Sequence, residues 1–386
     1  MIQPANRLSS VTEYYFSRKL REVAEMNAAG KQVINLGIGN PDMPPSPETI
    51  EALCAEAHKP DTHGYQSYVG IPELRQGFAD WYKKWYGVTL NPASEIQPLI
   101  GSKEGILHIT LAFVNPGDAV LVPDPGYPTY TSASRLCEAE VLTYPLLENN
   151  SWQPDFDALE AIDLSKVKLM WVNYPNMPTG ANGSMELFEK LVAFGKKHSI
   201  VICNDNPYSF ILNDQKISIL SIEGAADTCI ELNSMSKSHN MAGWRMAMLA
   251  SNATFISWIL KVKSNVDSGM YRPLMVGAVQ ALRNTDDWHE QMHQLYARRR
   301  EIAGKIMKAL HCSYDDSQVG MFLWAKIPDS YADSAALADE VLYGKNVFVT
   351  PGIIFGENGS RYVRISLCCT EEMLKQALER IENNIK

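Results

Sequence analysis

Short apolar runs alternate with helical patterns through the middle of the chain. Between about Ile96 and Met248, the apolar runs end in small or turn residues, and the segments between them repeat apolar positions every three or four residues. The apolar runs are IQPLIGS, AVLVPDPG, EVLTYPL, VKLMWVNYP, IVICNDNP and CIELNSMS, and the helical patterns include KEGILHITLAFV and SMELFEKLVAFGKKHS. This alternation predicts an α/β fold in which helices cover both faces of a mostly parallel sheet.

The pattern changes in the last third of the chain. A long helical stretch from about Thr254 to Leu310 precedes a smaller α+β lobe with strands at MFLWAKIP, VFVTPG and YVRISLC. Near the start, TEYYFSRKLREVAEM predicts a helix that packs against this lobe. Because one hydrophobic core rarely serves so long a chain, we expect two domains. The large domain spans residues 46–283, and the small domain joins residues 1–45 and 284–386.

Composition narrows the possible partners and compartment. The 386 residues are 46% hydrophobic and carry a net charge of −9, which argues against nonspecific binding to nucleic acid or to an anionic membrane. Seven cysteines without a CxxC motif fit a reducing compartment. The opening MIQPANRLSS has no apolar signal core, and no apolar run reaches the roughly 18 residues that span a bilayer. We expect a soluble, cytoplasmic protein.

A lysine stands in a small-residue loop between two predicted buried strands. The segment NSMSKSHNMAGWR places Lys237 between CIELNS and WRMAMLA, where a surface lysine gains nothing. Other polar residues also follow strands, among them Asp205 after VICN. Each has an ordinary explanation on its own; Asp205, for example, can cap a helix or turn. Because a parallel sheet gathers its carboxyl ends on one edge, we expect these residues to form a single site.

Part of this set suits a phosphate group. Ser102 and Lys103 open the helical pattern KEGILHI, so their backbone N–H groups face any bound anion. Ser234 adds a hydroxyl, and Arg245 adds a guanidinium that binds phosphate oxygens in bidentate fashion.

The remaining residues suit a flat aromatic aldehyde. Tyr127 in PDPGYPTY can stack on a ring, and the Asp205 carboxylate can keep a ring nitrogen protonated. Tyr208 can reach a phenolic oxygen, and the Lys237 amine can condense with the aldehyde. Together with the phosphate-binding residues, they predict pyridoxal 5′-phosphate as the cofactor.

These residues lie in motifs that resemble the class I/II aminotransferases, the fold type I family of pyridoxal-phosphate enzymes. The resemblance covers nearly the whole chain, in the family's order, and is closest to the aspartate and LL-diaminopimelate aminotransferase branch. The matching segments are INLGIGNPD, GYQSYVGIPELR, GSKEGI, PDPGYP, NYPNMPTG, NDNPY, SMSKSHNMAGWR, DSGM and YVRISL. It implies the fold type I architecture, with a large cofactor-binding domain and a smaller α+β domain.

The resemblance assigns roles by matching position. It implies that Lys237 is the Schiff-base lysine and the general acid/base, that Asp205 pairs with the ring nitrogen, and that Tyr208 contacts the ring oxygen. The other implied positions are Tyr127 for stacking, Ser102, Lys103, Ser234 and Arg245 for the phosphate with Ser236 as support, and Arg364 with the Gly39 backbone for the substrate α-carboxylate.

The resemblance also implies a homodimer. Tyr65 matches a tyrosine that, in the family, reaches the phosphate of the partner subunit, so each site would be shared between two chains. Asn265 and Ser268 lie in a segment that can also cross the interface, and we assign them no role.

One position departs from the family pattern. The family's usual NPTG is MPTG here, and Met177 stands where an asparagine normally contacts the ring oxygen and the substrate carboxylate. The neighbouring Asn176 should point elsewhere. We expect Tyr208 and Arg364 to take over this work and the substrate preference to shift.

The implied activity is ping-pong transamination between an L-amino acid and a 2-oxo acid, with 2-oxoglutarate as the expected acceptor. Aspartate, alanine and LL-diaminopimelate are the candidate donors. A carbon–sulfur β-lyase, a decarboxylase or a cyclopropane-forming synthase of the same fold would use the same residues, so these alternatives stay open.

Two other classes of protein also deserve weighing. HEQMH, from His289 to His293, matches the HExxH pattern of zinc hydrolases, but no glycine-spaced third histidine follows. We therefore interpret it as part of a surface helix and expect no metal. A cofactor-sensing DNA-binding regulator would need an extra N-terminal winged helix, whereas the enzyme-like pattern begins within the first 40 residues.

Overall fold

A seven-stranded sheet forms the centre of the larger part of the molecule. The computed structural model describes residues 2–10 and 15–383. The strand order is β2-β8-β7-β6-β5-β3-β4, and β8 runs opposite to the other strands of this sheet. The strands are β2 (Ile96–Leu99), β3 (Ala119–Asp124), β4 (Glu140–Pro145), β5 (Val167–Val172), β6 (Val201–Asp205), β7 (Cys229–Ser234) and β8 (Ala247–Ala250). The predicted mostly parallel sheet is confirmed.

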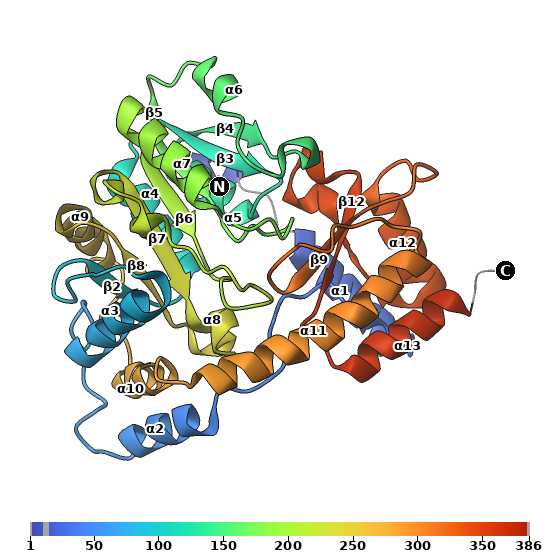
Figure 1. The fold of residues 1–386 in the computed structure, drawn as a ribbon, viewed down its shortest axis with the longest axis horizontal. Helices are drawn as coiled ribbons and strands as arrows, with labels where there is room; N and C mark the ends of the chain where they lie inside the picture. The colour runs from blue at the N-terminus through green and yellow to red at the C-terminus, as the bar shows by residue number, and fades with distance from the viewer. Residues whose placement is uncertain (1, 11–14, 384–386) are drawn as a thin grey trace.

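Helices cover both faces of this sheet (Figure 1). Apolar residues of α4, α5 and α9 share one buried cluster with the strands, and those of α6 and α7 share another. The helices of this part are α2 (Pro47–Ala57), α3 (Pro72–Tyr86), α4 (Ser102–Phe113), α5 (Pro128–Leu136), α6 (Phe156–Glu160), α7 (Met185–His198), α8 (Met235–Ser238), α9 (Ala253–Lys263) and α10 (Arg272–Ala281). The α/β class is therefore as the alternating pattern predicts.

The predicted long helical stretch is wrong as a single element. It is three helices, α9, α10 and α11, separated by residues 264–271 and 282–285. Gly269 has a φ of +86° in the first break, and a proline occupies the first turn of α10. A positive φ is not helical, and proline is favoured in the first turn of a helix, where its missing N–H costs nothing, so the two features separate α9 from α10.

The smaller part is built mainly from the C-terminal third. Its three-stranded antiparallel sheet has the order β11-β12-β9, and β10 pairs in parallel with β1. The predicted strand VFVTPG is thus two short strands in two different sheets. The elements are β1 (Ile34–Asn35), α11 (Asp286–Ala309), β9 (Phe322–Lys326), α12 (Ser334–Lys345), β10 (Val347–Phe348), β11 (Thr350–Pro351), β12 (Tyr362–Ser366) and α13 (Glu371–Glu382).

The N-terminal helix α1 (Tyr15–Ala28) packs against this C-terminal part, as predicted. Phe16 and Val23 join its buried core, and the Lys19 ammonium lies 3.0 Å from the Asp339 carboxylate. The predicted start of this helix, Thr12–Tyr14, lies outside the described residues. Helix α11 runs along both parts of the molecule (Figure 1). The boundaries at residues 45/46 and 283/284 stay a prediction.

Candidate active site

The loops at one edge of the large sheet surround a cavity of about 380 Å³. The loops that follow β2, β3, β5, β6 and β7 meet there with the turn that precedes the antiparallel β8. Every predicted site residue except Tyr65 lines it, namely Gly39, Ser102, Lys103, Tyr127, Asp205, Tyr208, Ser234, Ser236, Lys237, Arg245 and Arg364. Sequence positions more than 300 residues apart are thus brought together.

One end of the cavity has the features of an anion site. Helix α4 begins at Ser102, and its N-cap Gly101 has a φ of +82°. A Cβ at Gly101 would collide with the Arg245 guanidinium, so glycine lets this arginine lie over the helix N-terminus. The Arg245 Nη1 donates to the Ala242 carbonyl at 2.9 Å. The N–H groups at a helix N-terminus, beside a guanidinium, fit a phosphate.

The hydroxyl group of Ser234 lies at the start of the short helix α8. Its Oγ accepts a hydrogen bond from the Ser236 N–H at 3.2 Å, and the Ser238 hydroxyl donates to the Ser234 carbonyl at 3.1 Å. These bonds fix the turn that carries Lys237.

The Asp205 carboxylate is buried at the end of β6. Its Oδ2 accepts a hydrogen bond from the Tyr130 hydroxyl at 3.0 Å, whereas Oδ1 has no partner within residues 2–10 and 15–383. Burial raises the pKa of Asp205 to about 7, although the bond from Tyr130 opposes this shift. A buried carboxylate oxygen without a partner is costly, so the site fits a cationic donor such as a protonated ring nitrogen.

The Lys237 side chain reaches across the cavity and donates to the Gly39 carbonyl. Burial lowers the pKa of Lys237. Cys368 opposes this shift, and the nearby Arg364 and Arg245 cations each add a smaller lowering effect. A lowered pKa favours the neutral amine, which is the form that attacks an aldehyde.

Arg364 projects from β12 into the same cavity. Its Nη2 donates to the Gly37 carbonyl at 2.9 Å, and its Nη1 lies 3.2 Å from the Met177 sulfur. The guanidinium carbon is 3.9 Å from the ring centre of Phe322 and 4.6 Å from that of Phe355. Aromatic faces hold the guanidinium by cation–π contact and keep it ready for a carboxylate.

The asparagine beside Met177 points away, as expected. The Asn176 Oδ1 accepts from the Thr179 hydroxyl at 2.7 Å and from the Thr179 N–H at 3.2 Å. Met177 therefore presents a thioether where the family has an amide.

Two predicted tyrosines contribute aromatic walls. Tyr127 packs edge-on against Tyr130 with ring centres 5.6 Å apart, and Tyr208 packs against Phe322 at 5.8 Å. Burial raises the pKa of the Tyr208 phenol, so it stays a neutral donor.

Tyr65 does not join this cavity. Its side chain is 92% exposed and lines a separate hollow of about 300 Å³ with His63, Gln66 and the segment 268–271. An exposed tyrosine of this kind is available to another chain.

Sequence reasoning missed several residues of the cavity. Asn173 accepts from the Met177 N–H at 2.7 Å and donates to the Asp205 carbonyl, so it ties two strand ends together. Tyr130 stands only three residues after Tyr127 in PDPGYPTY, which is the signal that could have found it. The apolar Phe16 comes from the distant helix α1 and gives no local signal.

The interpretation of HEQMH as a surface helix is wrong for its first histidine. His289 is buried, with its ring 5.0 Å from Phe210 and 5.7 Å from Trp85, and burial lowers its pKa to about 4. Among the described residues, the His, Cys, Asp and Glu side chains grouped closely enough to hold a metal are Glu104, His108 and Asp267, not this pair.

Known proteins are similar to this chain in both sequence and fold. The family model "Aminotransferase class I and II" matches residues 31–381. LL-diaminopimelate aminotransferases from Dehalococcoides mccartyi and Nitratidesulfovibrio vulgaris are 39% and 41% identical over 381 and 382 residues, covering 98% of both chains in each case. The apo structure of BacF from Bacillus subtilis superimposes with a TM-score of 0.93 at 38% identity and covers 99% of this chain and 98% of its own. No helix in the described part of the chain is long and apolar enough to cross a membrane.

Proposed function

The chain belongs to the class I and II aminotransferases, which are fold type I enzymes that depend on pyridoxal 5′-phosphate, and on that premise we propose which residues carry the reaction and which substrates it takes. The buried, half-partnered Asp205 carboxylate in one cavity with the Lys237 amine is the observation that carries the assignment. It supports a site for a protonated ring that also bears an aldehyde.

We propose that the phosphate binds at the N-terminus of α4. Ser102 and Lys103 supply backbone N–H groups, and Ser234 supplies a hydroxyl. Arg245 adds a fixed positive charge, and Ser236 supports the turn.

Three residues of the cavity hold or move protons in the proposed reaction. When bound, pyridoxal phosphate supplies an aldehyde that condenses with amines and a ring that withdraws electrons from the substrate α-carbon. Asp205 keeps the proton on the ring nitrogen, and Tyr208 donates its phenolic proton toward the ring oxygen. The Lys237 Nζ takes the proton from the α-carbon of the donor amino acid, and in the second half of the reaction it returns a proton to the α-carbon of the acceptor as the oxo acid becomes an amino acid.

Arg364 orients the amino acid by its α-carboxylate. Its guanidinium is held by the Gly37 carbonyl and by the faces of Phe322 and Phe355, so two of its N–H groups can be presented in a fixed plane. The Gly39 backbone adds a second contact beside Lys237. Tyr127 packs on the cofactor ring.

The first donor to test is LL-diaminopimelate, because the curated relatives at about 40% identity carry that name. Aspartate and alanine are the other donors that the sequence motifs favour, and 2-oxoglutarate is the proposed acceptor.

A second class of donor is favoured by the lining of the cavity. Phe16, Leu20, Ile38 and Phe355 contribute apolar surface around the carboxylate-binding arginine. Burying a charged distal group against such side chains costs free energy, whereas an aliphatic or aromatic side chain gains it. Leucine and phenylalanine therefore belong in the same panel of donors.

An absorption titration tests the proposed function. The purified protein with pyridoxal phosphate should show a visible band that converts to the shorter-wavelength pyridoxamine form with the true donor, and 2-oxoglutarate should restore it. Formation of pyruvate and ammonia without this conversion would identify a β-lyase. Absence of any band with added cofactor would contradict the site.

We further propose a homodimer with shared active sites and a cytoplasmic location. The exposure of Tyr65 supports the first, because a 92% exposed tyrosine beside segment 268–271 is available to the cofactor phosphate of a partner subunit. Sedimentation of the wild-type protein and of Tyr65→Phe, combined with cofactor affinity, tests this: the variant should stay dimeric and bind pyridoxal phosphate more weakly. A monomeric wild type that binds the cofactor fully would contradict it.

A further inference from the structure

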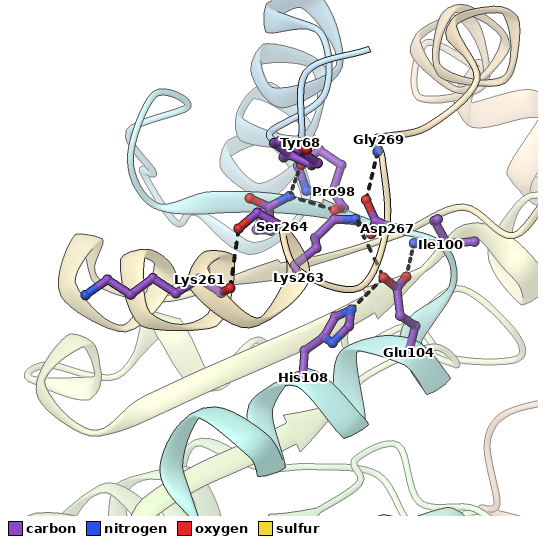
Figure 2. Close-up of polar contacts among 11 residues, drawn as sticks. Tyr68, Pro98, Ile100, Glu104, His108, Lys261, Lys263, Ser264, Asp267 and Gly269 are labelled. Atoms are coloured by element: carbon purple, nitrogen blue, oxygen red, sulfur yellow. Dashed lines mark hydrogen bonds and ion pairs between the residues drawn. The ribbon is translucent and has the colours of Figure 1, made fainter. Parts of the chain in front are cut away.

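A further lysine lies behind the proposed phosphate-binding helix. Lys263, the last residue of α9, is fully buried, and its Nζ bonds the Asp267 carboxylate. The same Nζ lies 3.6 Å from a Glu104 carboxylate oxygen, which in turn lies 2.6 Å from the His108 Nε2 (Figure 2). Four titratable side chains from α4, α9 and the following loop thus lie together, with Lys263 and His108 buried and the two carboxylates partly buried.

The Lys263 ammonium occupies the place that a metal ion could take in this cluster. Glu104, His108 and Asp267 have ligand atoms within 4.8 Å of one another, which is a spacing that suits a metal ion. The ammonium of Lys263 lies between the two carboxylates instead. Burial alone would raise the pKa of Asp267, but the bonds from Lys263 and from the Gly269 N–H overcome this and hold the pKa below its usual value.

The two carboxylates each hold a turn. The Glu104 Oε2 accepts from the Ile100 N–H at 2.6 Å, and Ile100 directly precedes the N-cap of α4. This bond fixes the turn that presents Ser102 and Lys103, in the manner of a residue at the third position of a helix that reaches back to the chain before it.

The Asp267 end holds the loop between α9 and α10. Its Oδ1 accepts from the Gly269 N–H at 2.8 Å. Gly269 has a positive φ and lies against the carbonyl of Gln66, where any Cβ would collide. Gln66 is the neighbour of Tyr65, so the cluster joins the helix that opens at Ser102 to the segment proposed to reach the partner.

We propose that Lys263 is a positioning residue for the cofactor phosphate, because its ammonium holds Glu104, and through it the N-terminal turn of α4, against the loop 264–271. This inference rests on the proposed function, since it concerns the same phosphate site. Removing one member of a buried ionic cluster leaves the others uncompensated, and the bonds that fix the turn weaken with it.

Cofactor affinity with and without the phosphate group tests this role. Lys263→Met keeps an unbranched side chain one atom shorter and removes its charge, and Lys261→Met on the exposed face of the same helix is the matched control. We expect Lys263→Met to bind pyridoxal phosphate about tenfold or more weakly, the loss that accompanies weakened hydrogen bonds to a charged group. Its affinity for pyridoxal, which lacks the phosphate, should stay within about twofold of wild type, as should both affinities of Lys261→Met.

Two results would overturn the proposal. One is a folded Lys263→Met whose affinity for pyridoxal phosphate equals that of wild type; the other is an equal loss for both ligands, which would mean a general structural effect. If Lys263→Met does not fold, Asp267→Asn decides in the same assay, with a selective loss of affinity for pyridoxal phosphate expected and an unchanged or nonselective result contradicting the role. A wild type that binds no pyridoxal phosphate would instead contradict the proposed function and this inference together.

Discussion

Two lysines near the proposed cofactor site, Lys237 and Lys263, have opposite surroundings. Lys237 contacts a backbone carbonyl and has two arginines nearby, and burial lowers its pKa. Lys263 is held between the carboxylates of Asp267 and Glu104. The first environment favours the neutral amine that we propose to react, and the second pairs the same kind of side chain with two carboxylates.

Asp205 and Asp267 differ in the same way, because one lacks a charged partner and the other has one. Asp205 has one buried oxygen without a partner in the described parts of the chain, and its pKa is raised to about 7. Asp267 is bonded to an ammonium and a backbone N–H, and its pKa is lowered. Unmatched buried charge marks the cavity proposed for the cofactor, and matched charge marks its support.

The largest expected effect comes from Lys237→Ala. We expect turnover to fall about 10³-fold or more, because the variant loses both the covalent attachment and the general acid/base. Lys263→Met, assayed at saturating cofactor, should keep most of its turnover. Steady-state kinetics of the two variants measure this, and partial rescue of Lys237→Ala by a small added amine is the control. Activity of Lys237→Ala within a factor of ten of wild type would break the comparison.

Asp205→Asn should reduce turnover by about 10²-fold, since it removes the anion proposed to stabilise charge on the ring during the reaction. The covalent attachment should survive, so the visible band remains while turnover drops. If turnover and the band are both unaffected, Asp205 does not face the cofactor ring.

In the cofactor-free protein, replacing Asp205 and replacing Asp267 by asparagine should shift the unfolding temperature in opposite directions. The folded-state pKa of Asp205, about 7, lies above its unfolded value of 3.8, so its contribution to stability is present below pH 4 and is lost as pH rises toward 7. Asp205→Asn should therefore unfold at a higher temperature than wild type at pH 8. The pKa of Asp267 is lowered, so its contribution is present at neutral pH and is lost on acidification.

Asp267→Asn should accordingly unfold at a lower temperature than wild type at pH 8. Its free energy of unfolding should fall by about 1–3 kcal/mol, the cost of losing a buried hydrogen bond to a charged group. Thermal melts of the three cofactor-free proteins from pH 4.5 to 8 supply the measurement. Shifts of the same sign in both variants would contradict the contrast.

Met177→Asn should have the smallest effect. Restoring the family's amide beside Arg364 should change the pH at which the visible band of the loaded enzyme titrates and alter the KM of the donor by a few fold, about the worth of one hydrogen bond. An unchanged titration together with unchanged kinetics would mean that the thioether has no part in substrate preference.

The sheet and most of the site could be predicted because both depend on local signals. Apolar runs ending in polar or small residues mark strand ends, and parallel topology alone brings those ends together. Lys237 and Asp205 can therefore be grouped from their positions along the chain, Arg245 joins them because it precedes the antiparallel β8, and all three line one cavity.

The residues that support the site could not be predicted, because their contacts join distant parts of the sequence. Glu104 and His108 look like an ordinary helix pair, and Lys263 looks like the polar end of α9, until the fold buries them against one another. Phe16 reaches the cavity from a helix nearly 350 residues before Arg364, and hydrophobic periodicity does not predict such a distant contact.

The most direct test of the central claim is to identify the lysine that binds the cofactor. The wild-type protein, loaded with pyridoxal phosphate and reduced with borohydride, should carry a pyridoxyl phosphate group on the peptide that contains Lys237, as found by mass spectrometry. Lys263 should be unmodified. A label on Lys263 or Lys103 instead, or no stable label at all, would contradict the roles proposed for Lys237 and Lys263.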